Sequence, residues 1–155
     1  MEGTLYYPTA VAVDPGARRV YVTDSMNHVV RLADLAVRAM TTVVGTLDGF
    51  GFAGDGGAAT AAQVHSPHTI AVDSAGQQMF IADTGNRVIR RMDMSTGVLA
   101  TISGTYSSGR TVRECSVEDG PATLMQLAYP SGLAVDTEAQ HLYVADAASH
   151  TVRRV

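Results

Sequence analysis

The sequence predicts an all-β fold built from β-propeller blades, each a four-stranded antiparallel sheet, with two complete blades and a truncated third. Two observations carry this prediction. One unit occurs three times in the 155 residues, and within each unit short apolar runs alternate with turn-forming residues. The three copies read YPTAVAVDPGARRVYVTDSMNHVVRL from Tyr7, SPHTIAVDSAGQQMFIADTGNRVIRR from Ser66 and YPSGLAVDTEAQHLYVADAASHTVRR from Tyr129.

Each copy contains the same succession of predicted strands. In the first, a proline opens a short apolar strand, a position where its missing N–H costs no ladder hydrogen bond. A strand with aromatic and β-branched residues follows and ends on Asp24, and a third strand leads to Arg31. Fourth strands are expected around 41–45 and 99–104. Such a meander has two apolar faces, so several must pack face to face around an axis.

These units divide the chain, residues 1–155, into one partial propeller domain. We place blade 1 at about 7–65, blade 2 at about 66–128 and the incomplete blade 3 at about 129–155. The two raw edges that this division leaves are expected to be association sites.

Composition limits the classes of function. Hydrophobic residues make up 46% of the chain and charged residues 17%, which is typical of a globular protein. The formal net charge of −4 disfavours a nucleic-acid partner.

Cys115 is the only cysteine, which excludes an intrachain disulfide and a CxxC zinc site. No apolar run approaches the ~18 residues of a membrane span, and the first residues lack signal-peptide features, so the sequence assigns no compartment.

One set of polar residues recurs once per unit. A catalytic group is needed once per site rather than once per blade, so we predict that this set caps turns and forms inter-blade ion pairs, and we assign no catalytic residue. These structural repeat residues are Asp14, Asp24, Asn27, Arg31, Asp73, Asp83, Asn86, Arg90, Asp136, Asp146 and Arg153.

Two histidines do not recur. His65 and His68 flank Pro67 at the start of an innermost strand, near the expected central channel. A catalytic zinc site needs about three protein ligands from separate strands, and this chain offers only this one place unless a dimer axis doubles it. We therefore expect His65 and His68 to be exposed or hydrogen-bonded histidines at the edge of this channel, and we expect no cofactor. In the alternative interpretation they are candidate ligands of zinc or calcium.

Two further groups of residues bear on recognition. The long connector with Arg110, Arg113 and Glu114 is predicted to be an exposed loop of the kind that carries recognition. Core or inter-blade packing is predicted for four tyrosines, with ligand contact at the rim as the alternative. They are Tyr6, Tyr7, Tyr106 and Tyr129.

The motif P-x-x-hydrophobic-A-V-D, followed by [YF]-[VI]-[AT]-D-x-x-[NS]-[HR]-x-[VI]-R, resembles the NHL repeat. The name-giving triplet reads Asn27-His28-Val29, Asn86-Arg87-Val88 and Ser149-His150-Thr151. The glycine-rich segment 45–67 is similar to the inter-blade connector of many NHL proteins and is expected to form a short helical step over 58–63.

The resemblance implies a non-catalytic NHL-repeat binding or scaffold module for a protein or small-molecule partner. Two alternatives stay open. The first is a metal-dependent propeller enzyme of the amidating-lyase or lactonase type, because His65 and His68 resemble the strand-start histidines of the amidating lyases. The second is an RNA-binding NHL domain. Family propellers usually close with six blades. We therefore expect either a six-bladed homodimer or packing against missing blades of a longer parent chain, with no nucleic-acid and no membrane partner.

Overall fold

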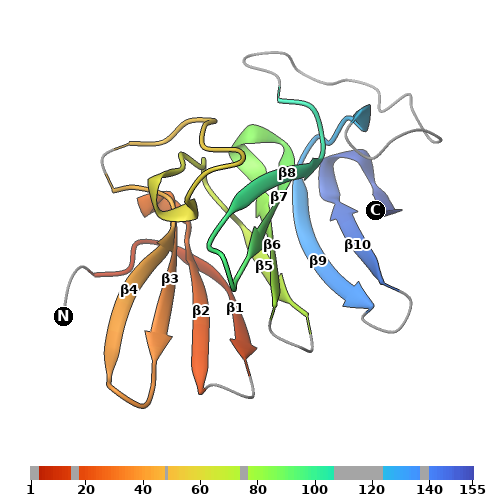
Figure 1. Cartoon of the computed structure of the whole chain (residues 1–155). Helices are drawn as coiled ribbons and strands as arrows, with labels where there is room; N and C mark the ends of the chain where they lie inside the picture. The colour runs from red at the N-terminus through yellow and green to blue at the C-terminus, as the bar shows by residue number, and fades with distance from the viewer. Residues whose placement is uncertain (1–3, 15–17, 48, 74–76, 107–123, 137–139) are drawn as a thin grey trace.

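The computed structural model describes residues 4–14, 18–47, 49–73, 77–106, 124–136 and 140–155 of the chain. These residues form three antiparallel sheets and a few short 3-10 turns (Figure 1). No helix among them is long and apolar enough to cross a membrane. The predicted all-β fold is confirmed.

Each sheet is a meander in which every strand pairs with its neighbour in the sequence. Blade 1 contains β1 (Pro8–Asp14), β2 (Arg19–Asp24), β3 (Val29–Asp34) and β4 (Ala39–Val44). Blade 2 contains β5 (Thr69–Val72), β6 (Gln78–Asp83), β7 (Val88–Asp93) and β8 (Leu99–Ser103). Blade 3, in the part of the chain that is described, contains β9 (Pro130–Asp136), β10 (His141–Asp146) and β11 (Thr151–Arg154). These are the two complete blades and the truncated third that the sequence predicts.

The strands are apolar on both faces. In β2, Tyr21 pairs with Leu32 of β3 on one face, and the neighbouring Val22 pairs with Arg31 on the other. Successive side chains point to opposite faces of a strand, so apolar residues at consecutive positions leave two faces to cover. A single blade of this composition therefore needs a neighbour on each side.

The second and third strands of every blade are joined by a 3-10 turn of the same shape. These turns are η1 (Ser25–Asn27), η3 (Thr84–Asn86) and η5 (Ala147–Ser149). Each ends on a residue in the left-handed conformation, namely His28, Arg87 and His150 with φ of 57°, 60° and 55°. The second position of the NHL triplet is thus a turn-closing residue rather than a strand residue.

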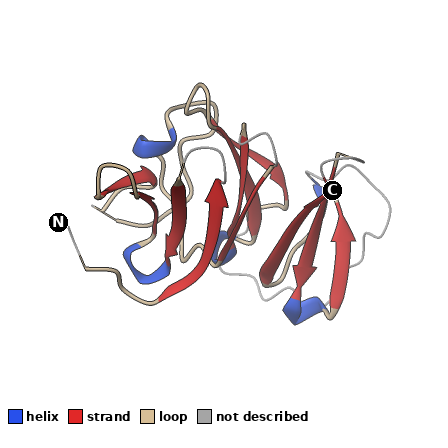
Figure 2. Ribbon diagram, turned by 90° about the horizontal axis from the view of Figure 1, so that it is seen from below, coloured by secondary structure: helices blue, strands red, loops and turns tan. Residues whose placement is uncertain are grey.

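The hydrophobic core lies between the blades. Seen from below, the sheets stand side by side (Figure 2). The first core joins residues such as Tyr21 and Val30 of blade 1 to Met79 and Ile81 of blade 2. The second core joins the opposite face of blade 2, including Ile89, to Leu142 and Val144 of blade 3. Blade 2 is therefore covered on both faces.

The glycine-rich connector crosses from blade 1 to blade 2. Its predicted helical step is a single 3-10 turn, η2 (Ala59–Ala61). The Gly45 amide, at the end of β4, donates to the Ala59 carbonyl at 3.0 Å, and the Ala59 amide donates to the Gly97 carbonyl at 2.8 Å. The Leu99 amide of β8 donates to the Gly57 carbonyl at 3.0 Å. The connector thus joins the outermost strands of the two blades.

A glycine follows the fourth strand of each complete blade. Gly45 and Gly104 have φ of +89° and +91°. A Cβ on Gly45 would lie 2.6 Å from the His28 carbonyl oxygen, and a Cβ on Gly104 would lie 2.5 Å from the Arg87 carbonyl oxygen. The backbone after the fourth strand therefore approaches the left-handed triplet residue too closely for any side chain.

We predict that Gly45→Ala destabilises the chain more than Gly97→Ala. Gly97 also has a positive φ, +72°, but a Cβ there would meet nothing within 4 Å. Gly97→Ala should cost only the backbone strain, about 1–2 kcal/mol, whereas Gly45→Ala adds a steric clash worth roughly 1–3 kcal/mol. Urea unfolding measures both variants, and equal losses of stability would contradict the close approach.

Candidate functional site

The aspartates that end the second strands are buried at one end of the blades, where β1, β5 and β9 begin; we call this end the rim. Asp24, Asp83 and Asp146 are fully buried. Asp24 Oδ1 accepts a hydrogen bond from the Tyr6 amide at 2.6 Å, and Asp83 Oδ1 accepts one from the His65 amide at 2.7 Å. Asp146 binds the two amides that precede Pro130, at 2.6 and 2.9 Å. Each carboxylate therefore fixes the chain where it enters the first strand of its own blade.

The first residue of each NHL triplet supplies a side-chain donor to this aspartate. Asn27 Nδ2 donates to Asp24, and Asn86 Nδ2 donates to Asp83, both at 2.8 Å. In blade 3, Ser149 Oγ donates to Asp146 at 2.7 Å. Asparagine and serine are interchangeable here because both place a donor on the carboxylate.

The repeated arginines complete two of these clusters. Arg31 Nε lies 3.3 Å from Asp24, and Arg90 Nη1 lies 3.4 Å from Asp83. We expected inter-blade ion pairs, and these two instead join adjacent strands of one blade. The expected kind is formed by Arg90 and Asp55, because Asp55 lies within the range 7–65 that the sequence assigns to blade 1. Arg90 reaches further through Nη2, which lies 2.9 Å from Asp55 of the connector. Its guanidinium carbon also stands 5.1 Å from the centre of the Phe52 ring.

The remaining repeat residues lie away from this buried set. Asp73 caps a turn, because its Oδ1 accepts the Gln77 amide at 2.7 Å. Asp14, Asp136 and Arg153 also take part in interactions within the chain.

Burial raises the pKa of Asp83 to about 6, although Asn86, the His65 amide and Arg90 each act in the opposite direction. The carboxylate is thus ionised at neutral pH and takes up a proton in mild acid. The pKa of Asp83 is thus higher in the folded chain than in the unfolded chain. Protonation of this group therefore favours the folded state, and that contribution to the free energy of unfolding is lost as the pH rises through about 6.

Hydroxyl groups join neighbouring blades at the rim. Ser25 Oγ donates to the Pro67 carbonyl, and Thr84 Oγ1 donates to the Pro130 carbonyl at 2.6 Å. In both cases the hydroxyl follows the buried aspartate and reaches the next blade. Blade 3 carries Ala147 at this position and has no hydroxyl there. Sequence reasoning missed these links, although Ser or Thr after the second aspartate of two copies was a usable signal.

The candidate ligand His65 is packed among aromatic rings. Its ring stacks on Phe50, with centroids 4.4 Å apart, and meets the edge of His28 at 5.4 Å. The Ser66 amide donates to His28 Nδ1 at 3.0 Å. Burial lowers the pKa of both histidines, and the neighbouring His65 lowers that of His28 further. His65 therefore has a packing role between blades 1 and 2.

The candidate ligand His68 lies in different surroundings. Its Nδ1 is 3.2 Å from the Ser131 carbonyl oxygen, and its ring meets the edge of Tyr129 at 5.8 Å. Within the described ranges, His, Cys, Asp and Glu side chains form no group of three or more that could hold a metal. His65 and His68 thus have different neighbours: His65 packs on Phe50, whereas His68 contacts Ser131 and Tyr129 of blade 3.

A cavity of about 450 Å³ opens at the rim; we call it the mouth cavity. All three blades contribute to its wall, through Tyr7, Met26, His68, Thr84, Arg87 and Tyr129 among others. We predicted core or inter-blade packing for four tyrosines. None of the four is buried in a core, although the Tyr129 ring contacts His68 of blade 2. The exposed fractions of Tyr6, Tyr7, Tyr106 and Tyr129 are 59%, 69%, 48% and 44%. The recognition loop predicted around Arg110 lies outside the described residues.

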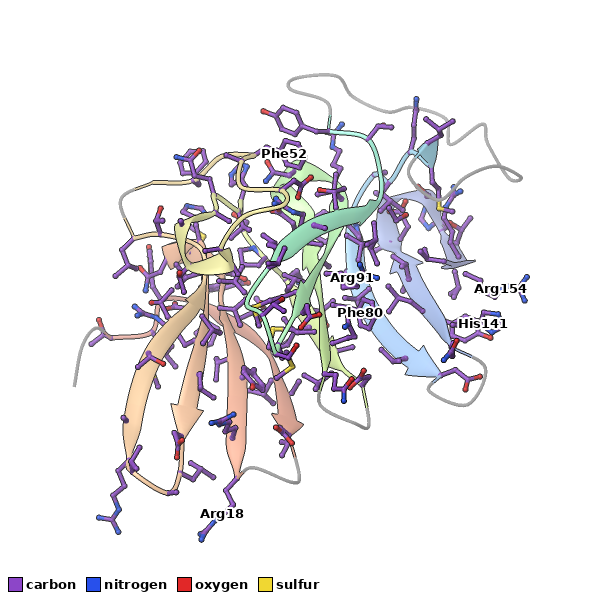
Figure 3. All side chains as sticks on the ribbon, viewed as in Figure 1. Arg18, Phe52, Phe80, Arg91, His141 and Arg154 are labelled. Atoms are coloured by element: carbon purple, nitrogen blue, oxygen red, sulfur yellow. The ribbon has the colours of Figure 1, made fainter. Side chains whose placement is uncertain are left out.

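A second cavity, of about 510 Å³, lies between blades 2 and 3. Phe80 and Arg91 point into the space between these blades, and His141 lies on β10 (Figure 3). The corresponding pair in blade 1 is Tyr21 and Leu32, which pack into the first core. A charged arginine in place of a leucine therefore leaves the second junction less completely filled.

We predict that Asp83→Ala destabilises the chain by about 1–3 kcal/mol, the cost of leaving a buried donor without its acceptor. The His65 amide and the Asn86 side chain lose this acceptor, and Arg90 loses one of its two carboxylate partners. Asp93→Ala is the control, since Asp93 accepts its hydrogen bonds from Ser95 and Thr96 in an exposed turn. Its loss of stability in urea unfolding should be much smaller. Similar losses for the two variants would show that the buried cluster is not a stabilising element.

Comparison with known proteins agrees with this geometry. Residues 7–149 match the Teneurin NHL domain family. The chain is 27% identical over 123 residues to NHL repeat-containing protein 2 of Bos taurus, an alignment that covers 79% of this chain and 17% of that protein. It is 32% identical over 150 residues to Teneurin-1 of Mus musculus, covering 88% of this chain and 5% of that protein.

A solved structure from Bacteroides thetaiotaomicron, described as a protein of unknown function, shares the fold. The TM-score is 0.80 at 20% identity, and the match covers 99% of this chain and 36% of that chain. This chain therefore spans a small part of each relative. From the match over residues 7–149 and the recurring aspartate clusters, the chain belongs to the Teneurin NHL domain family of NHL-repeat proteins.

Proposed function

We propose that this chain is a non-catalytic NHL-repeat scaffold that binds further blades through its two outer faces. A comparison of equivalent positions in the three blades carries the proposal. Val11 of blade 1 is 66% exposed, whereas Ile70, at the same position in blade 2, is 5% exposed. The outer face of blade 1 therefore has the composition of a face that another blade covers.

The opposite end of the chain gives the same result. Val152 of blade 3 is 72% exposed, whereas its equivalents Val30 and Ile89 are fully buried. Tyr143 is 37% exposed, against 3% for Tyr21 at the same position in blade 1. Burial of one such valine is worth about 1.5–3 kcal/mol, so covering both faces is a substantial driving force for association.

A blade fits these faces better than an unrelated partner does. The outer face of blade 1 corresponds to the face of blade 2 that packs on blade 1, and the outer face of blade 3 corresponds to the face of blade 2 that packs on blade 3. A second copy supplies both missing faces at once. We therefore propose a homodimer with six blades; further blades of a longer parent chain would cover the same faces.

The polar residues support a scaffold rather than a catalyst. The aspartates that end the second strands are buried and bind backbone amides, so their carboxylates are already occupied. A metal-dependent enzyme would need ligands beyond His65 and His68, whose surroundings differ. RNA binding is disfavoured by the net charge of −4.

We predict that the chain sediments as a dimer at micromolar concentration. Val11→Asp and Val152→Asp should each raise the dissociation constant of the dimer by at least about tenfold, because each substitution places a charge in the proposed interface. Val37→Asp is the matched control, because Val37 is 71% exposed in the turn between β3 and β4, away from both faces. This variant should remain dimeric.

A monomeric wild-type chain in analytical ultracentrifugation would contradict the homodimer. Equal weakening by Val37→Asp would show that the outer faces are not the contact surface.

A further inference from the structure

We propose that the mouth cavity binds a peptide segment that carries a carboxylate. This site is made by one chain and does not depend on the proposed dimer. Its volume of about 450 Å³ lies within the range of ligand sites, about 300–1,000 Å³. Three blades supply its wall, so the ligand would contact residues that are far apart in the sequence.

The charge of the wall selects the ligand. Arg87 lines the mouth cavity, and none of the described residues that line it is acidic, although the chain as a whole has a net charge of −4. The nearby carboxylates of Asp24 and Asp83 are fully buried and bind backbone amides. An acidic group on a ligand therefore meets a basic residue here, and the described part of the wall adds no exposed carboxylate.

Arg87 provides the donors for this carboxylate. It closes turn η3, where its amide donates to the Thr84 carbonyl at 3.1 Å, so its backbone position is fixed. Arg87 already takes part in a further interaction within the chain. A guanidinium has five N–H donors, however, and can bind a carboxylate through a pair of them while keeping another contact.

His68 provides a group of the opposite kind. The Ser131 carbonyl oxygen can only accept, so the hydrogen bond at 3.2 Å places the proton on Nδ1. The other ring nitrogen, Nε2, is then an acceptor in the neutral ring. A peptide N–H next to an acidic side chain suits this acceptor, which favours a peptide over an inorganic anion.

The apolar part of the wall favours a peptide as well. Tyr7, Met26 and Tyr129 line the mouth cavity and are 69%, 46% and 44% exposed. Tyrosine and arginine are enriched among the residues that dominate protein–protein binding energy. The hydrogen bonds from Ser25 and Thr84 to the next blade hold these walls in place before a ligand arrives, which lowers the entropic cost of binding.

The test compares two pools of fluorescein-labelled pentapeptides, one with Glu and one with Gln at the central position and mixed residues elsewhere. Fluorescence anisotropy should show at least about fivefold tighter binding of the Glu pool. Arg87→Gln should weaken Glu-pool binding by about tenfold and remove the preference for Glu. Tyr7→Ala, at an exposed position, should weaken both pools.

Arg38→Gln is the matched control. Arg38 is an exposed arginine in the same left-handed conformation, with φ of 55° against 60° for Arg87, in the turn between β3 and β4. The two variants therefore change charge equally on similar backbone. Arg38→Gln should leave Glu-pool binding within about twofold of wild type, the size of a remote charge effect.

Three results would overturn the proposal: equal binding of the Glu and Gln pools, equal effects of the two arginine variants, or tighter binding of a single-stranded RNA than of the Glu pool. Failure of the dimer is distinguishable from failure of this site. Val152→Asp should retain Glu-pool binding whether or not the chain dimerises, since Val152 does not line the mouth cavity.

Discussion

The rest of the structure depends on the buried carboxylate at the end of each second strand. Removing a carboxylate from water is costly unless hydrogen bonds and opposite charges replace the solvent. At Asp83 the His65 amide, the Asn86 side chain and Arg90 replace much of the solvent, although burial still raises the pKa of this carboxyl group to about 6. Asp83 thereby connects the first strand, the triplet turn and the third strand of one blade.

The same clusters also determine how one blade follows another. The side chain of Asn86 donates to the Gly51 carbonyl at 2.7 Å, and Arg90 donates to the Ala53 carbonyl at 3.2 Å. The connector that arrives from blade 1 is thus attached to the polar cluster of blade 2. With the Thr84 and Ser25 hydroxyls on the next blade, these bonds fix the rim from which the mouth cavity is built.

The sequence alone predicted the blades well, because each copy repeats the same strands and turns and threefold repetition reveals the period. It also singled out the aspartates, asparagines and arginines of the buried clusters and predicted a structural role for them. Their partners were less predictable: Asp83 and Arg90 lie on adjacent strands of one hairpin, which makes their ion pair internal to the blade. Exposure of Tyr7 and Tyr129 could not be inferred from residue type, since it depends on which positions the neighbouring blades leave uncovered.

The candidate site was the least predictable part. The two candidate histidines are near in sequence, yet His65 stacks on Phe50 while His68 contacts blade 3. The mouth cavity joins residues from three repeats, and their proximity follows from how the blades pack rather than from any spacing along the chain. Residues that break the repeat, such as His68 and Arg87, were the available signal for this site.

Hydrogen exchange tests the central role of the buried carboxylates most directly. The amides of Tyr6, His65 and Tyr129 lie outside the strands, yet each donates to a buried aspartate. We predict that these three amides exchange as slowly as an amide inside a central strand, such as that of Ile81. Fast exchange of all three, with the strand amides still protected, would contradict it.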